Sequence, residues 1–163
     1  MISSSFGKDS SKKYYAALIK EEGGRLRNRN GKLKVPEIGK RFTFSGFKRN
    51  KKEIPKWFYC ENIYVLAGYY DPARESIFEI EPDGRMLYNE KTRTYTSHYY
   101  TVLRELSDEE IQEMVDSFDQ SKLINGDTYE RAGVAMWTDN EEYLDILRED
   151  KSKFVRNAIE RRP

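Results

Sequence analysis

The sequence contains very few of the residues that most often form disulfides, bind metals or act in catalysis. Its 163 residues include one cysteine, Cys60, and one histidine, His98. A single cysteine cannot form an intrachain disulfide, and no cysteine and histidine spacing typical of a zinc site is present. There is no run of about 18 apolar residues to form a membrane-spanning helix, and residues 1–5 lack the cationic start of a secretory signal. We therefore expect a cytoplasmic protein with no membrane partner.

Motifs that identify enzymes are also missing. The sequence has no phosphate-binding P-loop, no G-x-G-x-x-G, no H-E-x-x-H and no G-x-S-x-G. His98 has no second histidine or cysteine near it in sequence, so we predict a structural or solvent-facing role for it. Cys60 lies in an apolar segment, so we predict a small buried residue rather than a nucleophile. Glu109 and Glu113 have the spacing that places two carboxylates on one helix face, which is more typical of a solvated surface than of a cation site. We predict a non-enzymatic protein with no catalytic residue, metal or cofactor.

Charge is abundant, and it is divided along the chain. The net charge is only +1, yet residues 1–60 hold sixteen Lys and Arg against five Asp and Glu, whereas residues 61–163 hold thirteen against twenty-three. Residues 105–150 alone carry fifteen acids and three bases. Because a surface of one sign attracts partners of the opposite sign at long range, the basic end favours a polyanion and the acidic end a basic protein.

The basic end contains two clusters with an aromatic segment beside the second. In residues 25–34 five bases alternate with neutral residues, and four more bases lie in residues 48–52. Such bases can contact successive phosphates and release counterions, and an exposed aromatic ring can stack on a base. The predicted nucleic-acid-binding residues are Arg25, Arg27, Arg29, Lys32, Lys34, Lys48, Arg49, Lys51, Lys52, Trp57 and Tyr59. DNA and RNA remain equal alternatives.

The hydrophobic pattern predicts an α+β fold in three parts. Residues 1–37 are expected to form an N-terminal helix, at about 12–22, followed by a flexible basic arm. Residues 38–106 are expected to form a small five-stranded antiparallel barrel, which pairs every strand edge around a small aromatic core. Its expected strands include 41–44, 57–70, 75–81, 85–88 and 95–106, with a hairpin turn at 81–84.

Residues 107–163 are expected to form a helical C-terminal extension. Ser107 with Glu110, and Thr138 with Glu141, have the spacing of capping boxes. They predict helices at about 107–119 and 139–161, each with one apolar stripe. The short apolar stretch 134–137 fits either a strand or a loop.

Three segments, residues 38–46, 63–70 and 99–103, carry a resemblance to a known family. Their order resembles the strand pattern of Tudor- and KOW-type SH3-like barrels over residues 38–106, although the segment 48–56 is longer than in compact barrels. The resemblance implies binding to nucleic acid, modified peptide tails or transcription machinery. Small, charged, aromatic-rich chains of this kind are also similar to phage early proteins that act on host transcription or defence.

Three functional hypotheses follow from these patterns. The leading one is a nucleic-acid-binding module in which the basic arm and the 48–52 loop contact phosphates. The second is an interaction or inhibitor protein whose acidic helical face binds a basic partner, for example by imitating the charge of DNA. The third is a small metal-independent nuclease that uses Arg, Lys and Tyr for acid–base chemistry.

Overall fold

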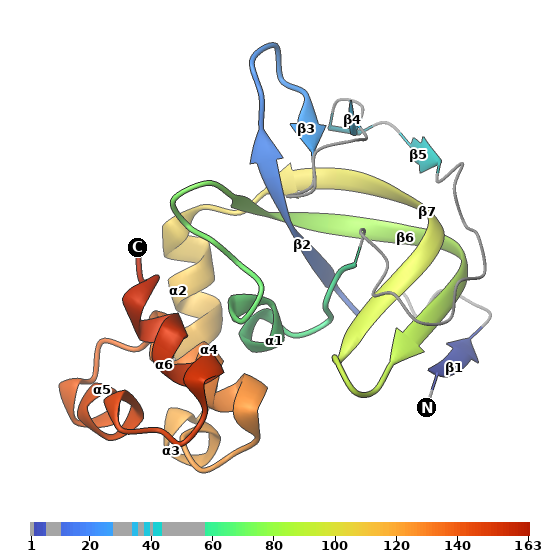
Figure 1. The fold of residues 1–163 in the computed structure, drawn as a ribbon. Coiled ribbons are helices and arrows are strands. Elements are labelled where there is room, and N and C mark those ends of the chain that lie inside the picture. Colours follow the sequence, from blue (N-terminus) through green and yellow to red (C-terminus); the bar gives the residue numbers. More distant parts are fainter. Residues whose placement is uncertain (1, 6–10, 28–33, 36–37, 40, 44–57) are drawn as a thin grey trace. The chain divides into compact units, whose positions relative to one another are not determined.

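A computed structural model describes residues 2–5, 11–27, 34–35, 38–39, 41–43 and 58–163 of the chain. The chain divides into two compact units, each built from more than one segment (Figure 1). Unit 1 consists of Met1–Glu61 and Ser76–Glu105, and unit 2 consists of Asn62–Glu75 and Leu106–Pro163. Unit 1 holds the strands and unit 2 the helices, so the predicted α+β class is confirmed.

Unit 1 is a curled antiparallel sheet (Figure 1). Its described strands are β1 (Ile2–Ser5), β2 (Tyr14–Lys20), β3 (Leu26–Arg27), β4 (Lys34–Val35), β5 (Arg41–Thr43), β6 (Ser76–Asn89) and β7 (Thr94–Glu105). They run in the order β4-β3-β2-β6-β7-β5, and β1 pairs with the far end of β6. Two register shifts between β6 and β7, at Glu79/Ile80 and Asp83/Met86, bend this long pair.

The core of unit 1 comes from alternate residues of its strands. In β2, Tyr14, Ala16 and Leu18 lie on one face, as the two-residue period of a strand requires. The other buried members of this cluster are Leu26, Tyr59, Phe78, Ile80, Met86, Tyr100 and Val102. Tyrosine rings fill much of the core, and Tyr14 meets Tyr59 edge to face with ring centres 5.5 Å apart. Such pairs stabilise beyond the area that they bury.

The helix predicted at 12–22 is wrong, because this segment is strand β2. Tyr14, Tyr15, Leu18 and Ile19 have helical spacing, but the same stretch also supplies an alternating apolar face. Residues 14–18 pair with residues 80–76 of β6. These hydrogen bonds and the shared core favour the two-residue period of a strand over the 3.6-residue period of a helix. The following glycines form the β2–β3 turn rather than a helix end.

The strand predicted at 57–70 is also wrong. Among its described residues, Tyr59 and Cys60 form only single bridges, Tyr59 with Tyr95 of β7 and Cys60 with Tyr15 of β2. The chain then turns into helix α1 (Ile63–Ala67), capped by the side chain of Asn62. The sheet is therefore a curled half-barrel in its described part, and a fully closed five-stranded barrel is not confirmed.

The predicted turn at 81–84 is not a turn either, since β6 continues through it to Asn89. The bulge between Asp83 and Met86 accommodates Gly84, which has a φ of 78°. The chain reverses at residues 90–93, inside the gap expected between the strands at 85–88 and 95–106, where the Asn89 side chain accepts hydrogen bonds from two following backbone N–H groups. A local side-chain bond of this kind is a turn signal that alternation alone does not reveal.

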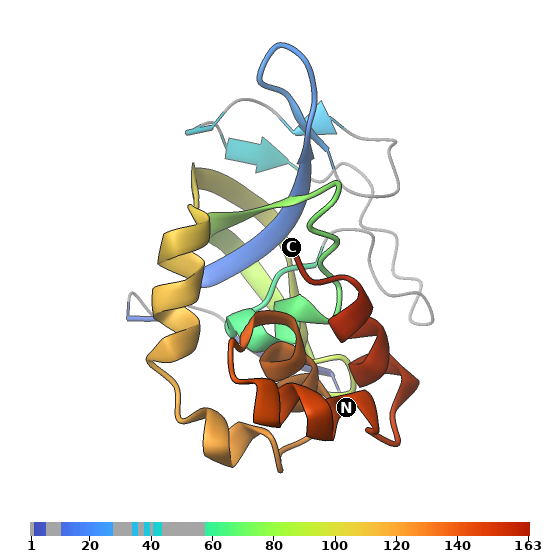
Figure 2. The same ribbon diagram turned by 90° about the vertical axis from the view of Figure 1, so that its left-hand side faces the viewer.

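Unit 2 contains the helices of the described chain. They are α1, α2 (Asp108–Asp116), α3 (Gln120–Leu123), α4 (Thr128–Trp137), α5 (Glu141–Arg148) and α6 (Lys153–Glu160). Helix α4 forms the centre and lies against both α1 and α6 (Figure 2). Gly133 of α4 allows the ring of Tyr64 to approach its backbone closely. Every residue of α4 from Ala132 to Trp137 is buried.

Of three sequence expectations for unit 2, the first was right, the second partly right and the third wrong. The Ser107–Glu110 capping box is present and begins α2. The helix predicted at 139–161 is two helices, α5 and α6, and its N-cap is Asn140 rather than Thr138, which ends α4. The stretch 134–137 is helical because Asp127 and Glu130 form a capping box before it. Every helix in the described part of the chain is too short or too polar to span a bilayer.

The boundaries of the two units differ from those of the three parts expected from the sequence. The described strands within residues 1–37 belong to the sheet of unit 1 rather than to a separate N-terminal part. The boundary expected after residue 106 lies one residue from the unit boundary after Glu105. Residues 62–75 lie inside the expected barrel in sequence, yet they belong to unit 2.

Candidate functional site

Among the predicted binding residues whose side chains the structure describes, Arg25 is the most exposed. It follows Gly23 and Gly24, whose φ angles of 80° and 77° favour glycine and allow the chain to reverse. The backbone N–H of Glu21 donates to the Arg25 carbonyl at 2.8 Å, which closes the β2–β3 turn. The turn projects beyond β6 and β7 in both ribbon views (Figures 1 and 2). The Arg25 side chain is exposed and forms no ion pair with any described residue.

Arg27 lies two residues farther along, on the same side of the chain as Arg25. Leu26 between them is buried, so the alternation seen in the sequence matches inward and outward positions here. Arg27 is half-buried, and its Nε lies 2.6 Å from Oε1 of Glu21. The β3–β4 register places Lys34 directly opposite Arg27.

The other predicted binding residues have different outcomes. Arg29, Lys32, Lys48, Arg49, Lys51, Lys52 and Trp57 lie outside the described residues. Tyr59 is described, and the expectation of an exposed stacking ring is wrong, because its side chain is only 1% exposed. A ring enclosed in this way cannot stack on a base.

Tyr59 is part of the core of unit 1. Its ring stacks on Tyr95 with centres 5.8 Å apart. Its hydroxyl makes no hydrogen bond among the described residues. Burial raises the pKa of Tyr59 well above its usual range. Tyr59 is therefore a packing residue with an unsatisfied polar atom.

A polar cluster that the sequence did not reveal lies beside these rings. The Tyr95 hydroxyl donates to Oε2 of Glu61 at 2.8 Å, and Nζ of Lys12 lies 3.2 Å from the same oxygen. Burial and the bond to Glu61 raise the pKa of Tyr95. A tyrosine that holds its proton so firmly is poorly matched to acid–base catalysis at neutral pH. Partners 34 and 49 residues apart in sequence give no local signal.

Cys60 is buried, as predicted, and burial raises the pKa of its thiol. It lies in the backbone bridge to Tyr15, with hydrogen bonds of 2.8 and 2.9 Å in the two directions. A protonated and enclosed thiol is a weak nucleophile. His98 belongs to β7 by its backbone. Among the described residues, no three potential metal ligands gather in one place.

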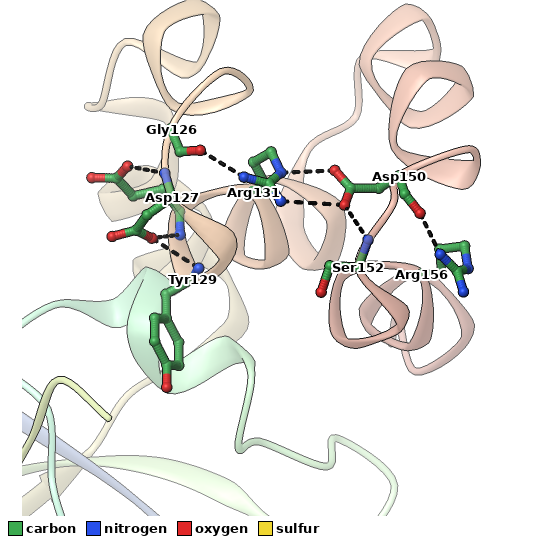
Figure 3. Close-up of polar contacts among 8 residues, drawn as sticks. Gly126, Asp127, Tyr129, Arg131, Asp150, Ser152 and Arg156 are labelled. Carbon is green, nitrogen blue, oxygen red and sulfur yellow. Dashed lines mark hydrogen bonds and ion pairs between the residues drawn. The ribbon is translucent and has the colours of Figure 1, made fainter. Parts of the chain in front are cut away.

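Unit 2 contains a buried ion pair that ties α4 to the α5–α6 connection (Figure 3). Nε of Arg131 lies 2.7 Å from Oδ2 of Asp150, with the side chains only 12% and 10% exposed. Nη1 of Arg131 also donates to the Gly126 carbonyl at 2.7 Å. Burial alone would raise the pKa of Asp150, but hydrogen bonds from Arg131 and from the Ser152 backbone N–H outweigh it and lower the pKa.

Helix α2 carries a row of exposed carboxylates. Asp108, Glu109, Glu113 and Asp116 are all exposed. Phe118, just after the helix, is also exposed. Glu109 and Glu113 are one turn apart, and two like charges at this spacing weaken a helix slightly. The surface of α2 is therefore strongly negative with an apolar end.

No protein-family model, curated protein or solved structure matches this chain. The assignment of function therefore rests on the residues described above.

Proposed function

We propose that unit 1 is a non-enzymatic nucleic-acid-binding module. The observation that carries this proposal is that charge follows the division into structural units. Unit 1 has twenty Lys and Arg against eleven Asp and Glu, and unit 2 has nine against seventeen, so the net charges are +9 and −8. A basic unit of this size attracts a polyanion, and an acidic one repels it.

The β2–β3 turn is the proposed centre of the interface. Arg25 is exposed there, Arg27 lies on the same side, and the β3–β4 register brings the backbone of Lys34 opposite Arg27. One guanidinium group can donate to two oxygens of the same phosphate, and it stays charged at all relevant pH values. The bases predicted from sequence at residues 29–32 and 48–52 belong to the same proposal on the strength of their charge alone.

We also propose that the curled sheet is an SH3-like barrel of the Tudor or KOW type. The backbone bridges at Tyr59 and Cys60 support this, because they connect β2 and β7 at one point on the sides of these strands that face away from β6. Such a barrel would add transcription machinery to the candidate partners. A cytoplasmic location is part of the same proposal, supported by a buried cysteine that has no disulfide partner.

Fluorescence anisotropy of labelled DNA and RNA at several salt concentrations tests the binding proposal. We expect log affinity to fall linearly with log salt concentration for the full chain. Replacing Arg25 and Arg27 with Gln should weaken binding to all sequences alike and reduce the slope by roughly 0.9 for each duplex phosphate that is no longer neutralised. An absence of binding to duplex and single strands at low salt would overturn the proposal.

A matched control removes the same charge from the same sheet. Lys13 and Lys20 are exposed, but Nζ of Lys13 lies 3.7 Å from Glu79 and Nζ of Lys20 lies 2.7 Å from Glu105. Carboxylates already neighbour both lysines, as Glu21 neighbours Arg27, whereas Arg25 has no ion-pair partner among the described residues. The Lys13→Gln, Lys20→Gln variant should therefore change the salt slope less than the variant that removes Arg25. If both double variants weakened binding equally, net charge rather than the β2–β3 turn would be responsible.

The acidic surface of α2 supports a second candidate function, binding of a basic protein segment. Its exposed carboxylates and the exposed ring of Phe118 offer charge and apolar contact together. Anisotropy of a labelled lysine-rich peptide tests it. We expect Glu109→Gln with Glu113→Gln to weaken binding, and Glu141→Gln with Glu142→Gln on α5 to have little effect. Equal losses would indicate non-specific attraction.

A further inference from the structure

A shallow pocket of unit 2 lies along one face of α6. Its cavity volume is about 270 Å³, and it is lined by Arg148, Lys153, Arg156, Asn157, Ile159 and Glu160. The α6 residues 153, 156, 157 and 160 recur at the spacing of one helix face. Arg148, which also lines the pocket, is the last residue of α5. Two consecutive helices therefore direct polar groups toward one hollow.

The lining is basic within a unit that is acidic overall. Three cations face one carboxylate, Glu160, although unit 2 as a whole has a net charge of −8. Arg148 contacts acids of its own helix, Glu141 and Asp145. Lys153 and Arg156 form no ion pair with any described residue. Two cations without an ion-pair partner among the described residues therefore share this pocket with Glu160.

Arg156 is also held in place before any ligand arrives. Its Nη1 donates to the backbone carbonyl of Asp150, whose side chain is bound by Arg131 and by the Ser152 N–H (Figure 3). These contacts fix the connection between α5 and α6 and leave the charge of Arg156 without a carboxylate partner among the described residues. A positioned cation loses less entropy when it binds than a mobile one does.

We propose that this pocket binds a phosphate group. Two guanidinium groups and an ammonium suit several oxygens of one tetrahedral anion, and the Asn157 amide can donate a further hydrogen bond. The first turn of α6 contains no acid to neutralise the positive end of the helix. The volume is slightly below that of pockets for drug-sized ligands, so it suits a phosphate or pyrophosphate whose carrier extends into solvent.

Titration of the full ¹⁵N-labelled chain with pyrophosphate at about 0.15 M ionic strength, followed by NMR, tests the site. We expect saturable shifts of the backbone amides of residues 153–160. Lys153→Gln should weaken binding by about tenfold, and Glu160→Gln should strengthen it. Lys153 is exposed, and its side chain bonds to no described residue, so the substitution should leave the helix intact, which circular dichroism checks.

Lys151→Gln is the matched control, since Lys151 is exposed two residues away and does not line the pocket. It should weaken pyrophosphate binding less than twofold, a range we expect for loss of a screened, non-contacting charge. Shifts that rise linearly without saturating, or an equal loss in the Lys151 and Lys153 variants, would overturn the proposal.

A second experiment distinguishes a phosphate of nucleic acid from that of a small molecule. A single-stranded oligonucleotide that competes with pyrophosphate for the α6 amides indicates a nucleic-acid phosphate, and one that does not compete excludes a single-strand phosphate and leaves a small phosphorylated ligand as the occupant. The proposal stands apart from the function of unit 1, because Arg25→Gln with Arg27→Gln should leave pyrophosphate affinity unchanged. Loss of oligonucleotide binding in that variant with intact pyrophosphate binding would separate the two sites.

Discussion

Two buried tyrosine hydroxyls, one bonded and one not, make a sharp test of the packing described above. The Tyr64 hydroxyl donates to the Val115 carbonyl at 2.7 Å, and both residues are fully buried. The Tyr59 hydroxyl is equally enclosed and has no partner among the described residues. Ser97 does not supply one by donation, because its hydroxyl proton goes to the Tyr99 carbonyl at 2.7 Å. Tyr→Phe at the two positions removes one oxygen each, with opposite consequences.

The expected change in the free energy of unfolding depends on which hydrogen bond, if any, is lost with each hydroxyl. In Tyr64→Phe the Val115 carbonyl loses one donor but keeps the Phe118 N–H at 3.2 Å, so the loss should be near the ordinary net value of about 1 kcal/mol. In Tyr59→Phe no bond is lost and a desolvated hydroxyl disappears. Burying an unbonded polar group costs about 1–3 kcal/mol, so this variant should be as stable as the wild type or more stable.

Urea and thermal unfolding, followed by circular dichroism, measure the difference. For a chain of this size about 1 kcal/mol corresponds to a melting shift of roughly 2–4 °C. The two variants should therefore separate clearly, with Tyr64→Phe below the wild type and Tyr59→Phe at or above it. A loss of more than about 1 kcal/mol in Tyr59→Phe would show that its hydroxyl has a strong partner and that the reasoning is wrong.

Three further predictions concern the other packing and titration features. A Cβ at Gly133 would lie 2.1 Å from Cδ1 of Tyr64, so Gly133→Ala should destabilise by about 1–3 kcal/mol in thermal melts despite the better helix propensity of alanine. Because the pKa of Asp150 is lowered in the folded chain, the stability from its pair with Arg131 is complete above about pH 4 and is lost as the pH falls further; Asp150→Asn should flatten the acid limb of an unfolding curve. Cys60 should resist alkylation in native protein at mildly alkaline pH and react on unfolding, as mass spectrometry would show; rapid native labelling would contradict its burial.

Local signals in the sequence located the elements whose stability is local. The Ser107–Glu110 box places α2 correctly, because both of its hydrogen bonds lie within four residues. Segments decided by distant partners were missed. The Ile63–Ala67 segment is rich in residues that favour strands, yet it is helical because Asn62 caps it and α4 covers it through Gly133. The packing against α4 cannot be read from the neighbouring sequence.

The same distinction applies to the candidate site. An exposed Arg25 follows from two glycines and a polar context, which are local. The burial of Tyr59 depends on its bridge to Tyr95, and the pocket on α6 depends on where the chain breaks between α5 and α6. A continuous helix from 139 to 161 would not bring Arg148 and Lys153 to one hollow in this way.

The insertion of residues 62–75 into the segments of unit 1 has a consequence for how the chain is made and cut. The polypeptide passes between the units three times, after Glu61, Glu75 and Glu105. During synthesis the five buried residues of α1 emerge before β6 and β7 exist, and α4, which covers them, is made later still. A truncated chain that ended after Glu105 would contain every described strand yet expose an apolar helix, so neither unit can be isolated by a single cut.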